Sequence, residues 1–233
     1  MRRFIAASAA FAALAAVPAT NAKVIEVGET TAAPAPVPAC STATSPCLAI
    51  SRTTGYQAKV GTDRGLMTIP ASGRIVAWTL ILSKPTDKQV SFFNTHLGGP
   101  AQAQLTVLKV APHLHDTVKG MSPLVALTPY FGSTAQFPLV NSIPVAKGDL
   151  IALTVPTWAP ALQVGLGNDT SWRAARGRNQ CKNTNDQTAQ LQTGDAAQYF
   201  CLYKTARLAY TATLITYPKQ TNKPAKKPAK KNR

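Results

Sequence analysis

The sequence predicts an all-β domain, an antiparallel β-sandwich that is most simply arranged as a jelly roll. Short segments rich in β-branched and apolar residues recur about 8–15 residues apart, and turn residues separate them. The chain holds 18 prolines, which argue against long helices. An immunoglobulin-like sandwich is the alternative, but the cysteine and tryptophan spacing does not fit it.

The N-terminal residues have the layout of a secretory signal peptide, which we place at residues 1–22. Arg2 and Arg3 form a positive start, and the apolar run that ends at Val17 follows. This run of about 14 residues is too short to span a bilayer as a helix. We therefore expect a secreted protein, extracellular or associated with the cell surface. No later segment is long and apolar enough to predict a transmembrane helix.

Residues 23–39 are rich in Ala, Pro and Val, and include Glu26 and Glu29. This composition predicts a linker that need not pack. The β-sandwich domain is expected over residues 40–217.

Four apolar runs are expected to form the centre of the sandwich: residues 74–82, 101–110, 149–155 and 206–217. Turn residues such as Pro70–Gly73 and Lys147–Asp149 precede them. In the first run, alternation places Val76, Trp78 and Leu80 on one face and Ile75 on the other. Both faces of that run are largely apolar, so its strand is expected to be central.

Residues 166–200 are polar, with several Asn, Gln and Arg and little β pattern. A connection of this length is unusual and often carries function. We expect one long loop that a disulfide holds in place.

The four cysteines are expected to form two disulfides, because an even number in an exported chain favours oxidation. Pairing Cys40 with Cys47 and Cys181 with Cys201 closes the shortest loops. A zinc site is the alternative, although no C-x-x-C pair is present.

Positive charge is concentrated at the C-terminus. Two of the 25 Lys and Arg lie in the signal peptide, which leaves 23 against 9 Asp and Glu. Residues 219–233 hold seven basic side chains and no acidic one. We expect residues 218–233 to be a disordered Lys/Pro/Ala tail that attracts an anionic polymer or glycan of the cell envelope. Export argues against nucleic acid as the partner, although lysines can neutralise phosphates.

The sequence gives little support for an enzyme. No glutamate lies between residues 40 and 217, and no nucleophile or phosphate-binding motif is present. His113 and His115 have the spacing of two metal ligands on a strand, and Asp116 is adjacent. Their polar surroundings favour solvated side chains, so no metal, cofactor or catalytic residue is assigned. A hydrolase with an unrecognised Asp/His site remains an alternative.

The candidate binding residues are two tryptophans and three arginines in or near the long loop: Trp158, Trp172, Arg173, Arg176 and Arg178. Exposed tryptophan beside arginine suits stacking on sugar rings and contact with anionic glycans. The alternative is that the tryptophans pack in the core and the arginines are merely solvated.

Several segments, among them residues 73–79, 155–161, 171–176 and 205–214, resemble an uncharacterised family of secreted bacterial all-β proteins. The resemblance covers residues 40–217 and implies no activity, so it transfers no functional residue. The sequence thus predicts a non-catalytic exported protein that associates with the cell envelope through its basic tail. A carbohydrate-binding module that uses Trp158, Trp172 and the loop arginines is the alternative.

Overall fold

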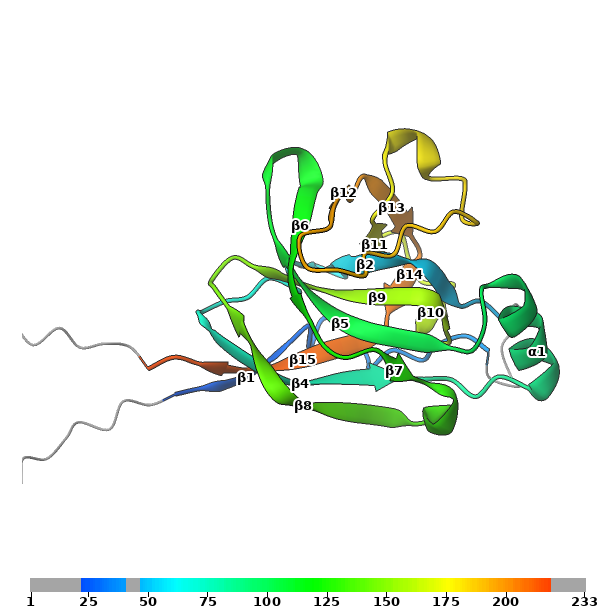
Figure 1. Cartoon of the computed structure of the whole chain (residues 1–233), viewed down its shortest axis with the longest axis horizontal. Helices are drawn as coiled ribbons and strands as arrows, with labels where there is room; N and C mark the ends of the chain where they lie inside the picture. The colour runs from blue at the N-terminus through cyan, green and yellow to red at the C-terminus, as the bar shows by residue number, and fades with distance from the viewer. Residues whose placement is uncertain (1–21, 41–46, 219–233) are drawn as a thin grey trace, which may run out of the picture.

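The computed structural model describes residues 22–40 and 47–218 and confirms an all-β sandwich with two disulfides (Figure 1). Apart from Ala22 and Pro218, the predicted signal peptide and the predicted tail lie outside the described residues. Cys40 is bonded to Cys47, and Cys181 is bonded to Cys201. Both predicted pairings are therefore confirmed.

Eight strands form a jelly roll: β1 (Val24–Val27), β2 (Ile50–Val60), β4 (Gly73–Ile81), β5 (Gln102–Lys109), β6 (His115–Met121), β8 (Thr134–Val145), β9 (Leu150–Ala159) and β15 (Tyr210–Thr216). The first of these strands pairs with the last, the second with the seventh, the third with the sixth and the fourth with the fifth. All four pairings are antiparallel. This nesting is that of one long hairpin wrapped into two sheets, which is the predicted architecture.

The two sheets differ in size. The smaller sheet has the order β1-β15-β4-β8, and the larger contains β6-β5-β9-β2 at its centre. The larger sheet continues into β11 and β13 at one edge and into β12 at the other. The remaining strands are short: β3 (Asp63–Arg64), β7 (Val125–Ala126), β10 (Leu162–Val164), β11 (Ser171–Ala174), β12 (Ala196–Gln198), β13 (Cys201–Lys204) and β14 (Ala206–Leu208).

Strand β4 is central in the smaller sheet, as its two apolar faces predict. The predicted alternation along it is wrong at one point. Ile75, Trp78 and Leu80 are all fully buried, because β4 has one more residue than β15 between Ile75 and Ala77, where their pairing register shifts. A bulge adds one residue to a strand and so moves an odd-spaced side chain to the same face.

The prediction that residues 23–39 form a linker that need not pack is wrong. Val24–Val27 forms β1, the first jelly-roll strand, and pairs with β15 at the edge of the smaller sheet. Val27 is buried, and Thr211 and Thr213 donate hydrogen bonds to the carboxylate of Glu26. Further along, Arg207 donates to the carbonyl oxygen of Pro34 at 2.8 Å. This segment therefore packs on the domain.

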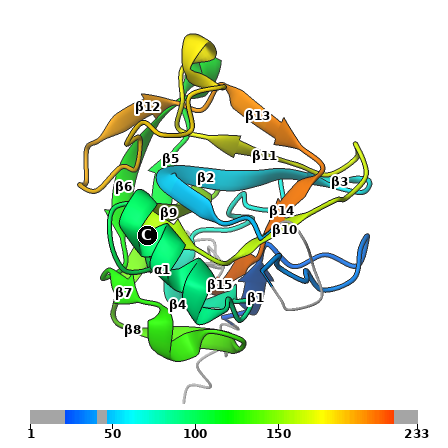
Figure 2. The same cartoon turned by 90° about the vertical axis from the view of Figure 1, so that its right-hand side faces the viewer.

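Among the described residues the α-helix is α1 (Asp87–His96), which lies at an end of the sandwich, where Figure 2 views it from outside. The sequence does not predict this helix. A capping box starts the helix: the side chain of Thr86 accepts from the amide of Gln89, and the side chain of Gln89 accepts from the amide of Thr86. Three short 3-10 turns occur elsewhere: η1 (Pro112–Leu114), η2 (Thr128–Tyr130) and η3 (Arg178–Gln180).

The polar segment 166–200 follows β10 and lies against the larger sheet. It was expected as one loop, but it contributes β11 and β12 to opposite edges of that sheet. Between these strands it crosses the sheet face on which the hydroxyls of Thr54, Thr154 and Thr106 form a buried hydrogen-bonded row. The amide of Gln190 donates to the hydroxyl of Thr54 at 2.9 Å. The segment thus covers a polar sheet face and supplies a hydrogen-bond donor to its row of hydroxyls.

Candidate ligand-binding cavity

The side chain of Trp158 lies in the core and not on the surface. It is 0% exposed and packs against Phe93 and Phe131, with ring centroids 4.8 and 5.5 Å away. Its indole Nε1 donates to the side chain of Asn94 at 2.9 Å and to the carbonyl of Gly99 at 3.1 Å. An exposed ring for sugar stacking is therefore not what the structure has at this position.

Trp172 and Arg176 are brought together. Trp172 lies in β11 beside Tyr203 of β13, with ring centroids 4.8 Å apart. After β11 the chain turns sharply, because the amide of Arg176 donates to the carbonyl of Ala174 at 2.7 Å. Both side chains line one cavity of about 290 Å³, whose walls also include Tyr203, Leu48, Leu162 and Thr184. We name it the Arg176 cavity.

The Arg176 side chain is buried without a protein partner among the described residues. It is 2% exposed, its Nε has no hydrogen-bond partner, and no ion pair to it is found. Every Asp and Glu of the chain lies in the described residues. The one ion pair among these residues joins Lys119 and Asp149 and does not involve Arg176. A buried, unpaired charge costs several kcal/mol of stability. The cavity wall thus carries a cation that the fold itself does not neutralise.

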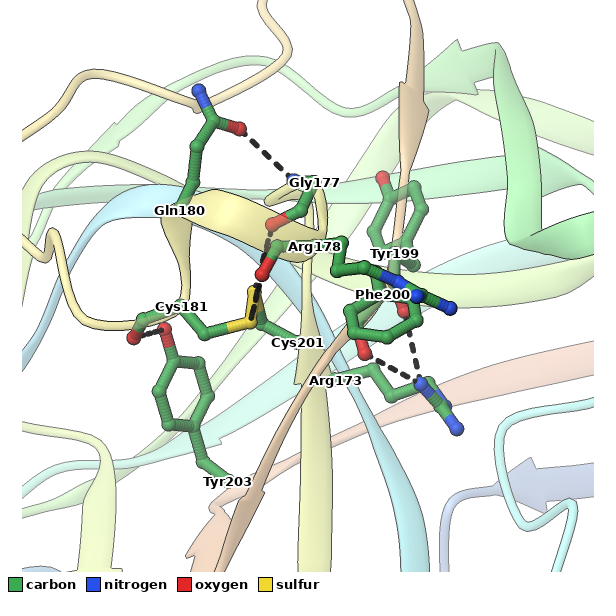
Figure 3. Close-up of a disulfide and its surroundings, with 9 residues drawn as sticks. All are labelled: Arg173, Gly177, Arg178, Gln180, Cys181, Tyr199, Phe200, Cys201 and Tyr203. Atoms are coloured by element: carbon green, nitrogen blue, oxygen red, sulfur yellow. Dashed lines mark hydrogen bonds between the residues drawn. A yellow bond between two sulfur atoms is a disulfide. The ribbon is translucent and has the colours of Figure 1, made fainter.

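Arg173 and Arg178 lie elsewhere. Arg173 alternates with Trp172 along β11 and therefore points to the opposite face of the strand. Its guanidinium donates to the carbonyls of Tyr199 and Phe200, at 3.1 and 2.9 Å (Figure 3). Arg178 is exposed, and its guanidinium lies 5.0 Å from the centre of the Phe200 ring. Of the five predicted binding residues, only Trp172 and Arg176 line the Arg176 cavity.

A second cavity, of about 260 Å³, lies on the side of β11 that carries Arg173. Its walls include Arg173, Arg64, Tyr56 and Leu150. Burial, and secondly the charge of Asp116, raise the pKa of Tyr56 to about 12. Tyr56 is therefore a neutral hydrogen-bonding group at physiological pH. The two arginines of this cavity differ from Arg176, because Arg64 is exposed and Arg173 already has two carbonyl partners.

The three residues considered as metal ligands do not share one environment. His113 and His115 are exposed, whereas Asp116 is 0% exposed. One carboxylate oxygen of Asp116 accepts from the amide of Ala111 at 3.0 Å, and the other has no partner in the described structure. Within residues 22–40 and 47–218, no three His, Cys, Asp or Glu side chains are grouped as metal ligands.

Replacing Asp116 by asparagine is expected to stabilise the protein at pH 7. Burial raises the pKa of Asp116 above the ordinary value for aspartate, although the bond from Ala111 and the charges of His115 and Arg173 oppose this. Ionisation therefore costs stability, and the cost grows as pH rises from the unfolded pKa of about 3.9 through the folded one. Urea unfolding of D116N and wild type should show a gap at pH 7 that closes at about pH 3.5, where both side chains are neutral.

Asp169→Asn is the matched control for this prediction, because Asp169 is exposed. It should leave the unfolding free energy within about 0.5 kcal/mol of wild type at both pH values. The prediction would be contradicted if D116N were less stable than wild type at pH 7. It would also be contradicted if the difference in unfolding free energy between the two proteins did not change with pH.

The sequence does not predict Tyr203 as a site residue, nor the apolar residues Leu48 and Leu162 in the cavity wall. They come from three separate segments, before β2, in β10 and in β13, and no local motif connects them to Trp172. Only the tertiary fold brings them together.

No helix among the described residues has the length and apolar character needed to cross a membrane. Two disulfides in a small all-β domain are typical of an oxidising, extracellular environment. Comparison of the chain with protein-family profiles, curated proteins and solved structures finds no match. The charge and the cavities of this structure are therefore what indicates its function.

Proposed function

We propose that the chain is an exported, non-catalytic binding protein that associates with an anionic polymer of the cell envelope. The signal-peptide layout of residues 1–22 and the two disulfides support export. The jelly roll then serves as a rigid, disulfide-stabilised body, and the association depends on electrostatic attraction.

The observation that carries this proposal is the uncompensated positive charge. Of 25 basic side chains, two lie in residues 1–21 and seven in residues 219–233, which leaves 16 beside all nine acidic ones in the described residues. Only one ion pair is found in that part of the chain. The seven further cations of residues 219–233 have no acidic neighbour in the same segment. Such a charge distribution attracts polyanions over distances of about one Debye length, roughly 8 Å at physiological salt.

Removing residues 219–233 is expected to weaken retention on the cell envelope and leave the fold intact. The deletion takes away seven of the positive charges and keeps every strand of the described residues, the last of which ends at Thr216. Binding of wild type to an immobilised anionic wall polymer should fall steeply between about 0.1 and 1 M salt, as the Debye length falls from about 10 to 3 Å. The truncated protein should bind more weakly at low salt and show a shallower salt dependence.

A full-length variant with the six lysines of this segment changed to glutamine is the matched control, because it keeps the length and the prolines. It should behave like the truncated protein, while binding to neutral dextran stays at background for all three. An unchanged bound fraction and salt profile after truncation would refute the proposal.

The second candidate is a carbohydrate-binding module, which the shared cavity of Trp172 and Arg176 favours. An aromatic ring and a guanidinium in the walls of one cavity suit an acidic sugar. Oligosaccharides with uronic acid units should then bind in a salt-dependent manner, and their neutral counterparts should not. Equal binding of both, or of neither, would remove this candidate.

A further inference from the structure

We propose that the Arg176 cavity is the binding site of a small organic carboxylate. The carboxylate pairs with the guanidinium of Arg176, and the apolar or ring-shaped part of the ligand lies against Trp172 and Tyr203. This site is distinct from the charge-driven envelope association proposed above and does not depend on it. It is the same cavity as that of the carbohydrate-binding candidate, of which an acidic sugar would be one special case.

The need for an anion follows from the state of Arg176. Its side chain is 2% exposed, its Nε is unpartnered, and no aspartate or glutamate in the chain forms an ion pair with it. The other arginines near the inserted strands are satisfied differently, since Arg173 and Arg207 donate to carbonyls and Arg178 is exposed. Arg176 is thus the buried cation of this region whose partner is not in the described protein.

The class of anion follows from the cavity walls. A single arginine balances one negative charge, and its planar fork matches the two oxygens of a carboxylate. Around it lie the Trp172 ring and the aliphatic side chains of Leu48 and Leu162. Arg176 is the one cation among the described residues of this lining, so it would leave the second charge of a phosphate dianion unbalanced, whereas a monoanion with an apolar body is complementary to both parts. A volume of about 290 Å³ suits a small molecule.

The cavity walls are held in place before any ligand binds. A Cβ atom on Gly55 of β2 would lie 2.8 Å from the Trp172 ring, so the glycine permits the ring to pack directly on the backbone of β2. The hydroxyl of Tyr203 donates to the carbonyl of Cys181 at 2.9 Å (Figure 3), and Cys181 is bonded to Cys201. A site that is already ordered loses less entropy on binding.

The test is a binding titration of the full mature chain, followed by NMR and by thermal shift. The probes are benzoate, cyclohexanecarboxylate and glucuronate, with benzamide as the uncharged counterpart of benzoate. Wild type is expected to bind at least one carboxylate and not benzamide. Arg176→Met should weaken that binding by about ten- to a hundredfold, because a charge-assisted hydrogen bond is lost. Arg176→Lys should restore part of the affinity.

Three further proteins separate this proposal from loss of fold and from the envelope association. Arg74→Met removes an exposed arginine on the smaller sheet and should bind the probe as wild type does, as should the protein that lacks residues 219–233. Ala49→Phe fills the cavity without changing charge and should also abolish binding. Without probe, the Arg176→Met protein should melt no lower than wild type, since it loses an unpaired buried charge.

The proposal is overturned if no carboxylate in the panel binds to wild type, if benzamide binds as well as benzoate, or if Arg176→Met leaves the affinity unchanged. Loss of probe binding on deletion of residues 219–233 would also overturn it, because the site would then belong to the basic segment.

Discussion

Replacing Trp158 by alanine is expected to lower the free energy of unfolding by about 3–5 kcal/mol. The side chain is fully buried at the end of β9, where helix α1 packs on it through Phe93. Alanine would leave a large cavity between the helix and the sandwich, and it would also leave the side chain of Asn94 without its indole partner. Urea unfolding monitored by circular dichroism measures the loss.

Two variants decide between packing and hydrogen bonding as the source of this effect. Trp158→Phe keeps most of the ring volume and loses the two indole bonds, so it should cost less than alanine. Val140→Ala, at a fully exposed apolar position of β8, should change stability by no more than about 0.5 kcal/mol. A Trp158→Ala protein with wild-type stability would show that the ring does not lie in the core.

Four of the eight jelly-roll strands, β4, β5, β9 and β15, were predictable because each is an apolar run with its own signal. Residues 101–110 and 149–155 are apolar runs bounded by turn residues, and they form β5 and the start of β9. Strand β1 was missed because its four residues sit in an Ala/Pro-rich segment, whose composition outweighs so short a pattern. Helix α1 was missed although Thr86 and Gln89 have the spacing of a capping box, because its apolar positions are too few for a clear helical period.

The candidate site was predictable in part. Trp172 and Arg176 are four residues apart on a segment whose length and polarity drew attention, and the structure places both in one cavity. Arg173 could have been separated from them by strand alternation, but the segment showed too little β pattern for β11 to be predicted. Trp158 looks the same in the sequence as an exposed tryptophan. It is buried because Phe93 of α1 and Phe131 pack on it. Both lie far from Trp158 in the sequence, so its neighbours in the chain do not predict the burial.

Removing the Cys181–Cys201 disulfide by changing both cysteines to serine is expected to lower the free energy of unfolding by about 3 kcal/mol. The bond closes a loop of sequence separation 20 and ties the turn after β11 to β13 (Figure 3). Without it the unfolded chain gains more freedom than the folded one, and Cys181 no longer fixes the segment that orients Tyr203. Urea unfolding under oxidising conditions measures the change.

The Cys40–Cys47 bond is the matched comparison, because its sequence separation is only 7. Loop-closure entropy grows with the logarithm of loop length, so the corresponding double serine variant should cost about 2.5 kcal/mol and rank below the first. The two variants should also differ at the Arg176 cavity. Loss of the Cys181–Cys201 bond frees the backbone carbonyl of Cys181, which accepts a hydrogen bond from the hydroxyl of Tyr203. The Tyr203 side of the cavity wall is then less ordered, so carboxylate binding should weaken. If the Cys40–Cys47 variant proves the less stable of the two, the inserted segment is held by its hydrogen bonds to β2 and not by its disulfide.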